Sequence, residues 1–322
     1  MNRSAILLFG LSLCLQAVSS AQAAAGGESI MVMEAHSGKV LFASNSTQKR
    51  PIASLTKMAT AAVAVDWAAA TGTDISKVEI TVPGTVTLVG GPNPLGLIPG
   101  ERMSLRDAIY AMMLSSDNLA ALSVADHVGR RLLQSRGKGG EPVVEFVAEM
   151  NRLAQALGMR STRFGNPHGL ERKGVNAYST AADVARLSVY VMRLNALNFI
   201  VRQTSRSVEI HGASGNRTAV IRNTNELLGH DGVLGIKTGT TAAAGPCLAT
   251  SVHRDPLVRL KPDGTKGATP RRLIVVVLNS PDRFGRTRGL IQRGWAIYDA
   301  WLNAGAQVTD PKREIISVPN PL

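Results

Sequence analysis

The order of hydrophobic and polar positions predicts strands at both ends of the chain and helices in the middle. Alternating stretches at 29–34 and 39–43 predict a hairpin that turns at 36–38. From residue 207 onward, short runs rich in β-branched residues predict strands at 208–210, 218–221, 233–240, 247–252 and 273–278. We therefore expect an α+β fold in which 28–50 and 205–302 form one antiparallel sheet, with a helical lobe inserted at about 54–200.

The middle of the chain has apolar positions at helical spacing. Ser104 with Asp107 three residues later resembles a capping box and predicts a helix, which is interrupted by the polar turn 115–118 and then resumes. Thr180 and Asp183 repeat this start signal. Further helices are expected from near Ser54 to Gly72, at 142–157 and at 286–302, and a short strand at 78–82. The proline-bearing residues 310–322 show no such periodicity and predict a tail.

The helix that begins near Ser54 carries a lysine in unusually apolar surroundings. Lys57 is the only charged residue between Arg50 and Asp66. Ser54 and Lys57 are three residues apart and share one helix face. Burial disfavours the charged form of a lysine, so the pKa of Lys57 should fall and the amine could act as a base. Ser54, near the positive end of the helix dipole, is a candidate nucleophile.

Two other pairs have the same spacing, Ser46 with Lys49 and Ser135 with Lys138. Both lie in polar stretches, where a solvated lysine is a sufficient explanation. A serine and a lysine at this spacing are common, so the Ser54 pair taken alone leaves a purely structural role open.

The first 23 residues have the features of a secretory signal peptide. A basic start at Arg3 precedes an apolar core at 5–15 and an Ala-x-Ala cleavage site at 21–23. The core is too short for a comfortable transmembrane helix, and Leu13 before Cys14 disfavours lipidation. Cleavage would remove Cys14 and leave Cys247 alone, so we expect no internal disulfide. The protein is expected to be exported to the periplasm or another extracytoplasmic space, soluble or loosely bound to wall or membrane.

The charge and the composition narrow the possible partners. The formal charge is +13, and Arg3 is the only charge lost with the signal, which leaves +12. A basic exported protein suits an anionic envelope surface, although solubility alone would explain the charge equally well. Six scattered histidines lack metal-ligand spacing and no Gly-rich phosphate loop follows a strand. We expect no metal, no cofactor, no nucleic-acid partner and no stable membrane anchor.

Three short motifs occur in order along the chain. They are Ser54-x-x-Lys57, Ser116-Asp117-Asn118 and Lys237-Thr238-Gly239. A similar triplet, 214–216, lies in a turn between predicted strands and is rejected. The combination is typical of class A β-lactamases and penicillin-binding proteins.

The chain resembles the low-molecular-mass penicillin-binding proteins of the serine D-Ala-D-Ala carboxypeptidase family over about residues 28–302. The resemblance rests on the stretches 51–57, 99–101, 168–170, 222–225 and 235–241, followed by Ala244-Gly245. It implies a β-lactamase/transpeptidase-like fold, with a five-stranded antiparallel sheet flanked by helices beside an all-helical lobe. Residues 24–302 would form the catalytic domain and 303–322 a short tail.

The resemblance also implies roles for individual residues. Ser54 would attack the peptide carbonyl and Lys57 would take its proton, while Ser116 relays a proton to the leaving amine and Asn118 orients Lys57 and the substrate amide. The backbone amides of Ser54 and Thr240 would hold the oxyanion.

The third motif would bind the substrate. Lys237, Thr238 and Thr240 would receive the terminal carboxylate, and Gly239 would let the substrate lie along its strand. The expected activity is trimming of peptidoglycan stem peptides that end in D-Ala-D-Ala, with β-lactams as covalent inhibitors.

Several departures keep alternatives open. The second motif is Ser-Asp-Asn where many carboxypeptidases have Ser-Gly-Asn, and we expect this chain to lack the family's C-terminal β-domain and amphipathic helix. The Arg-Asn-Thr-Asn stretch at 222–225 is closer to the shorter D,D-endopeptidases, so cleavage of crosslinks is an alternative.

Two further classes are less well supported. A class A β-lactamase would need a glutamate in a Glu-x-x-Leu-Asn setting, which Glu171 lacks. An inactive peptidoglycan-binding or sensor protein would be favoured by loss of Ser54, Lys57 or Lys237, and none of these is lost.

Overall fold

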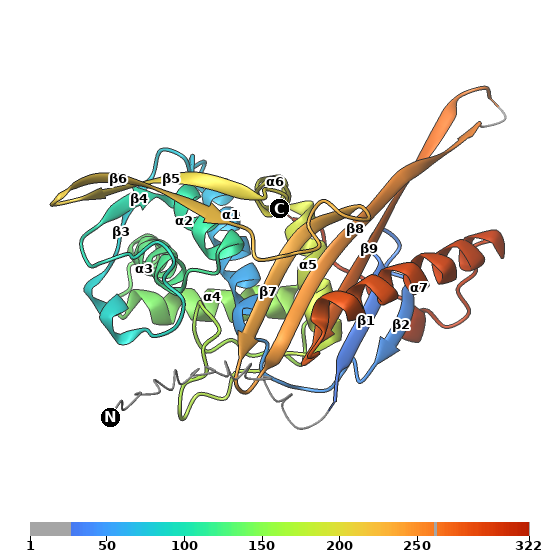
Figure 1. The fold of residues 1–322 in the computed structure, drawn as a ribbon, viewed down its shortest axis with the longest axis horizontal. Coiled ribbons are helices and arrows are strands. Elements are labelled where there is room, and N and C mark those ends of the chain that lie inside the picture. Colours follow the sequence, from blue (N-terminus) through green and yellow to red (C-terminus); the bar gives the residue numbers. More distant parts are fainter. Residues whose placement is uncertain (1–26, 261–262, 322) are drawn as a thin grey trace, which may run out of the picture.

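The computed structural model describes residues 27–260 and 263–321. The predicted signal peptide at 1–23 therefore lies outside the described residues. A five-stranded antiparallel sheet stands beside a group of helices (Figure 1). Its strands are β1 (Ser29–Glu34), β2 (Val40–Ser44), β7 (Val233–Thr241), β8 (Gly245–Leu260) and β9 (Lys266–Leu278).

The strand order β2-β1-β9-β8-β7 confirms that both ends of the chain build one sheet. The N-terminal β1 pairs with β9 from near the C-terminus, with Val32 opposite Val275. Neighbouring residues of β9 belong to two different apolar clusters, Ile274 to one and Val275 to the other. Because successive side chains point to opposite faces of a strand, both faces of the sheet are buried.

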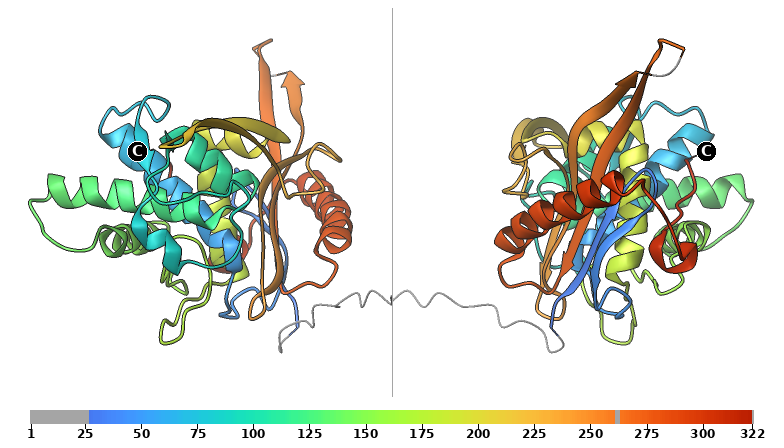
Figure 2. Two further views of the ribbon diagram at one scale, coloured as in Figure 1. Left: turned by 60° about the vertical axis from the view of Figure 1, so that its left-hand side comes forward. Right: turned by 90° about the vertical axis from the view of Figure 1, so that its right-hand side faces the viewer.

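Helices cover the two faces. Helix α7 (Arg283–Asn303) lies across one face, and the helical lobe lies against the other (Figure 2). The helices of the lobe are α1 (Lys57–Ala70), α2 (Leu105–Leu114), α3 (Asn118–Ser135), α4 (Pro142–Ala156), α5 (Ala181–Arg193) and α6 (Asn195–Val201). Short 3₁₀ helices η1 (Ala53–Thr56) and η2 (Gly84–Leu88) precede α1 and α2. Ser104 and Thr180 accept hydrogen bonds from the amides of Asp107 and Asp183, which confirms both predicted helix starts.

One part of the sheet prediction is wrong. Strands β5 (Ser205–Gly212) and β6 (Gly215–Arg222) do not join the large sheet but form a second one with β3 (Glu79–Thr81) and β4 (Arg102–Ser104). The buried side chains of β5, Val208 and Ile210, belong to the core of the helical lobe. An alternating pattern shows that a strand has a buried face, but it does not show which core covers that face.

Residues 303–321 do not form the unstructured tail that the sequence predicts. They contain the short helix α8 (Pro311–Glu314), and Ile315 forms a β-bridge with Lys39. Ile316 is 8% exposed and packs into the main core.

Among helices of the described ranges, none alone is long and apolar enough to cross a bilayer. Only the pair α5 and α6 together reaches that length and composition, with a bend of 102° between them.

Candidate active site

The N-terminal end of α1 places Ser54 and Lys57 side by side. Ser54 lies in η1, one turn before Lys57 opens α1, so the two side chains share a face as predicted. Lys57 Nζ lies 2.9 Å from Ser54 Oγ. Lys57 is fully buried, and this burial sets its pKa well below the ordinary value; the nearby charge of Lys237 lowers the pKa further, whereas Asp117 raises it.

Two further oxygen atoms accept hydrogen bonds from Lys57 Nζ. Its Nζ donates to Asn118 Oδ1 at 2.7 Å and to the carbonyl of His168 at 2.9 Å. A neutral amine has two N–H donors and one lone pair. With both donors used by Asn118 and His168, the lone pair of neutral Lys57 faces the Ser54 hydroxyl. This is the arrangement that a general base needs.

The orientation of Asn118 is set by a loop. Its Nδ2 donates to the carbonyl of Gly90 at 3.0 Å, so its Oδ1 faces Lys57. Its backbone amide donates to the carbonyl of Pro92 at 2.9 Å. The Asp117 carboxylate caps α3 by accepting from the amides of Leu119 and Ala120. Burial raises the pKa of the Asp117 carboxyl.

Ser116 lies in the turn between α2 and α3, two residues before Asn118, with a φ of +65°. Within the part of the chain that the structure describes, its hydroxyl makes no protein hydrogen bond. Among the described residues no hydrogen bond joins the Ser116 hydroxyl to Ser54 or Lys57, and its role as a proton relay stays a prediction.

Strand β7 passes close to the serine. A Cβ on Gly239 would lie 2.9 Å from the backbone nitrogen of Ser54, a separation that real side chains do not adopt, so glycine permits this approach. The two preceding residues, Lys237 and Thr238, are buried. Lys237 Nζ donates to the carbonyl of Thr238 at 3.1 Å. Burial, with the charge of Arg283, lowers the pKa of Lys237 to about 7.

The structure adds residues that sequence reasoning did not assign. Arg283, in the first turn of α7, donates to the carbonyl of Gly239 at 3.0 Å and to Thr240 Oγ1 at 2.8 Å. The hydroxyls of Thr224 and Thr238 lie 2.6 Å apart. No local pattern marks Arg283, because its relation to β7 arises only when α7 packs on the sheet.

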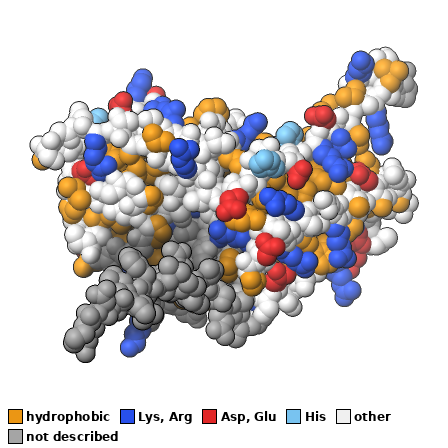
Figure 3. Space-filling view, in the orientation of Figure 1, with side chains coloured by type: hydrophobic (Ala, Val, Ile, Leu, Met, Phe, Trp, Pro, Cys, Tyr) orange, Lys and Arg blue, Asp and Glu red, His pale blue; other side chains and the backbone are white. Residues whose placement is uncertain are grey.

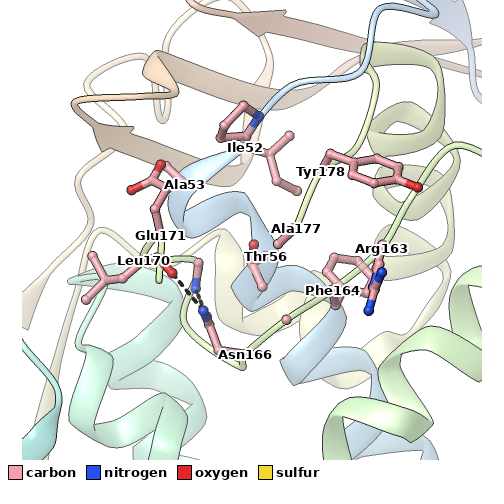
Figure 4. A pocket seen from close by; sticks show the side chains of 13 residues that line it. Ile52, Ala53, Thr56, Arg163, Phe164, Asn166, Leu170, Glu171, Ala177 and Tyr178 are labelled. Carbon is pink, nitrogen blue, oxygen red and sulfur yellow. Dashed lines mark hydrogen bonds between the residues drawn. The ribbon is translucent and has the colours of Figure 1, made fainter. Parts of the chain in front are cut away.

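The loop that supplies the His168 carbonyl is stabilised by hydrogen bonds between its own residues. Asn166 Oδ1 accepts from the amides of His168 and Gly169, and its Nδ2 donates to the Leu170 carbonyl at 2.7 Å (Figure 4). Gly169 has a φ of +88°, and a Cβ there would overlap the Ala53 carbonyl. A small pocket behind η1 separates this loop from Tyr178. The loop therefore presses its backbone against the turn that carries Ser54.

The chain is similar to known proteins over most of its length. A family model described as D-alanyl-D-alanine carboxypeptidase matches residues 16–261. The D-alanyl-D-alanine endopeptidase of Pseudomonas aeruginosa is 33% identical over 237 residues, 71% of this chain and 68% of that protein. The D-alanyl-D-alanine endopeptidase of Escherichia coli is 30% identical over 276 residues, 80% and 82% of the two chains. The carboxypeptidase DacF of Bacillus subtilis is 28% identical, and the match spans 54% of its length.

Solved structures agree with this assignment. The Streptomyces DD-transpeptidase matches with a TM-score of 0.69 and 25% identity, over 83% of this chain and 96% of that one. A penicillin-binding protein of Listeria monocytogenes in its ampicillin-bound form matches with a TM-score of 0.63 and 25% identity, over the same shares. Family model, relatives and fold converge, and the chain belongs to the D-alanyl-D-alanine carboxypeptidase family of serine peptidases.

Proposed function

We propose that this protein is a serine D,D-peptidase that removes the terminal residue of peptidoglycan stem peptides ending in D-Ala-D-Ala. The observation that carries the proposal is the position of Lys57 Nζ, held by Asn118 and His168 and 2.9 Å from Ser54 Oγ. Ser54 Oγ forms a bond to the carbonyl carbon, and its proton passes to neutral Lys57.

The tetrahedral intermediate then collapses. The amides of Ser54 and Thr240 hold the oxyanion until the C–N bond breaks, and the leaving amine takes a proton through Ser116. Water attacks the resulting ester and returns Ser54 to its free form. The close approach of β7 to Ser54 at Gly239 supports this assignment, because it puts the strand that would bind the substrate beside the nucleophile.

The substrate carboxylate would lie beside the third motif, on the strand that passes Ser54. Lys237, Thr238 and Thr240 supply the cation and hydroxyls for a charge-assisted contact. We add Arg283 to this group, since its guanidinium already contacts Thr240 Oγ1.

Cleavage of peptide crosslinks is the second candidate. A crosslink also joins D-Ala to the D-centre of an amino acid with a free carboxylate, so the same residues would serve both reactions. Two relatives named D-alanyl-D-alanine endopeptidases favour it, since they are 33% and 30% identical to this chain. Purified crosslinked and uncrosslinked muropeptides, digested side by side, distinguish the two: a carboxypeptidase releases D-Ala, whereas an endopeptidase converts dimers to monomers.

The nucleophile can be tested with labelled penicillin. The strained amide of the drug should acylate Ser54, and Ser54→Ala should abolish the label while leaving the circular dichroism spectrum unchanged. Ser46→Ala is the matched control and should label normally. Labelling that persists in Ser54→Ala would place the nucleophile elsewhere.

We also propose that the acylated drug stays on the enzyme. Class A β-lactamases use a glutamate to activate the deacylating water. Here the carboxylate of Glu171 instead accepts a hydrogen bond from Thr241 Oγ1. Nitrocefin should give one stoichiometric burst. Sustained turnover at many cycles per second would favour a β-lactamase.

The proposed location is extracytoplasmic, with the signal at 1–23 removed. The remaining charge of +12 should hold the protein reversibly on anionic envelope polymers. We expect it in the soluble fraction or released by salt, and recovery only with detergent would contradict this.

A further inference from the structure

Strands β8 and β9 continue well beyond the sheet. Within the described residues, β7 pairs with β8 only as far as Val252, and β1 pairs with β9 only as far as Leu273. The two long strands go on pairing with each other out to Leu260 opposite Lys266. The result is a projecting two-stranded ribbon whose paired strands are 254–260 and 266–271 (Figure 1); we call the stretch of chain from 254 to 271 the arm.

One face of the outer arm carries exposed aliphatic side chains, with Lys266 opposite Leu260 on the same face. Val258 and Leu260 are 60% and 72% exposed, and because they are two residues apart they point to the same side. Ala268 lies directly opposite Val258 and extends this face. Figure 3 shows hydrophobic side chains at the tip of the arm, next to basic ones. Large aliphatic side chains this exposed, grouped at a tip, suggest contact with something outside the molecule.

The arm is also strongly basic. Residues 254–271 hold five basic and two acidic residues, a net charge of +3. In the described part of the chain, the side chains of Arg259 and Lys266, near the tip, form no ion pair. These charges are therefore available to an anionic surface.

The edges of the arm are protected against strand addition. Pro256 and Pro270 each remove a backbone donor, and Asp255 and Arg271 place charges on the flanks. A partner that adds a strand is therefore disfavoured. Two exposed aliphatic side chains, Val258 and Leu260, also supply far less than the roughly 800 Å² that each partner of a stable protein interface buries.

We propose that the arm docks on an anionic phospholipid membrane, with Val258 and Leu260 inserted into the interface and Arg259 and Lys266 at the level of the phosphates. Amphipathic surfaces bind membranes through this combination of apolar burial and attraction to anionic lipids. Cys247 lies opposite Gly239 at the site, and Leu260 is 13 residues further along β8, so the tip lies about 40 Å from Ser54 at ~3.3 Å per residue. A docked arm would hold the site well above the lipid.

The test measures binding of the purified mature protein to vesicles. Wild type should sediment with equimolar phosphatidylglycerol and phosphatidylcholine, and not with phosphatidylcholine alone. The double variant Val258→Asp/Leu260→Asp should bind at least about tenfold more weakly. Arg259→Glu/Lys266→Glu should lose roughly fivefold or more per residue at low salt. Val220→Asp, at a position 65% exposed on β6, is the matched control and should bind like wild type.

A fluorescent label reports on insertion itself. An environment-sensitive dye on Val258→Cys should brighten and shift to the blue on phosphatidylglycerol vesicles, whereas the same dye on Val220→Cys should not. All variants should react with penicillin at the wild-type rate, because the arm is remote from Ser54. The proposal is overturned if the aspartate variant binds like wild type, if the dye on the arm does not respond, or if binding is equal on neutral vesicles.

Discussion

Two buried lysines have different tasks in the proposed reaction. Lys57 must be neutral to accept a proton, and burial with the nearby charge of Lys237 lowers its pKa well below the ordinary value. Lys237 must be charged to attract a carboxylate, and its pKa of about 7 makes that charge depend on pH in the working range. The environment of each residue, more than its type, therefore decides its role.

The pH profile follows from these two groups. For a peptide with a free carboxylate, kcat/KM should rise as Lys57 loses its proton and fall above about pH 7 as Lys237 loses its own. In Lys237→Arg the cation persists at all working pH values, so the alkaline limb should disappear even if the overall rate is lower. If kcat/KM of this variant still falls at high pH, a group other than Lys237 causes that fall.

Lys57→Arg tests the base. Arginine keeps a positive charge but does not deprotonate at working pH, so penicillin acylation should fall by roughly 10²–10⁴-fold. Lys49→Arg, in the polar stretch before Pro51, is the control and should acylate normally. Near-normal acylation by Lys57→Arg would show that the residue contributes only charge.

At the scale of elements, the loop between η2 and β4 positions Asn118. Gly91 has a φ of +81°, and a Cβ there would lie 2.6 Å from Asn118 Nδ2. The neighbouring carbonyls of Gly90 and Pro92 accept from the side chain and the backbone of Asn118. Glycine at position 91 thus allows the loop to hold the Asn118 amide with its oxygen toward Lys57.

Gly91→Ala should therefore reduce acylation by tenfold or more, because Asn118 must move away from Lys57. Gly96→Ala is the matched control: its φ is +59°, but a Cβ there meets nothing within 4 Å. Equal losses in both variants would indicate backbone strain alone.

At the scale of the whole molecule, the C-terminal segment 315–318 binds to two elements that lie far from it in the sequence. The Ile316 amide donates to the Gly38 carbonyl at 2.8 Å, and Arg186 donates to the Ser317 carbonyl at 2.7 Å. The segment thereby joins the β1–β2 turn to α5.

Ile316→Ala should lower the free energy of unfolding by about 2 kcal/mol, near the low end for a buried isoleucine. That corresponds to a fall in Tm of roughly 4–8 °C. Val144→Ala, at a position 68% exposed on α4, should change Tm little. Penicillin acylation should be unchanged in both. A thermal scan in which Ile316→Ala matches wild type would mean that the segment adds no stability.

The sequence by itself determined those features that depend on neighbours along the chain. Ser54 and Lys57 share a face because helical geometry brings residues three apart together. The caps at Ser104 and Thr180 are local for the same reason, and the terminal strands follow from alternation and β-branched composition. The order of the three motifs predicted the family correctly.

Only the tertiary structure decided which residues far apart in the sequence contact one another. The His168 and Gly90 carbonyls are backbone atoms, so the residue types at these positions do not reveal that they hold Lys57 and Asn118. The assignment of β5 and β6 to a second sheet depends on which core covers Val208, and Arg283 reaches Thr240 only because α7 packs on the sheet. Each of these contacts joins segments far apart in the chain, and local propensity carries no information about such pairings.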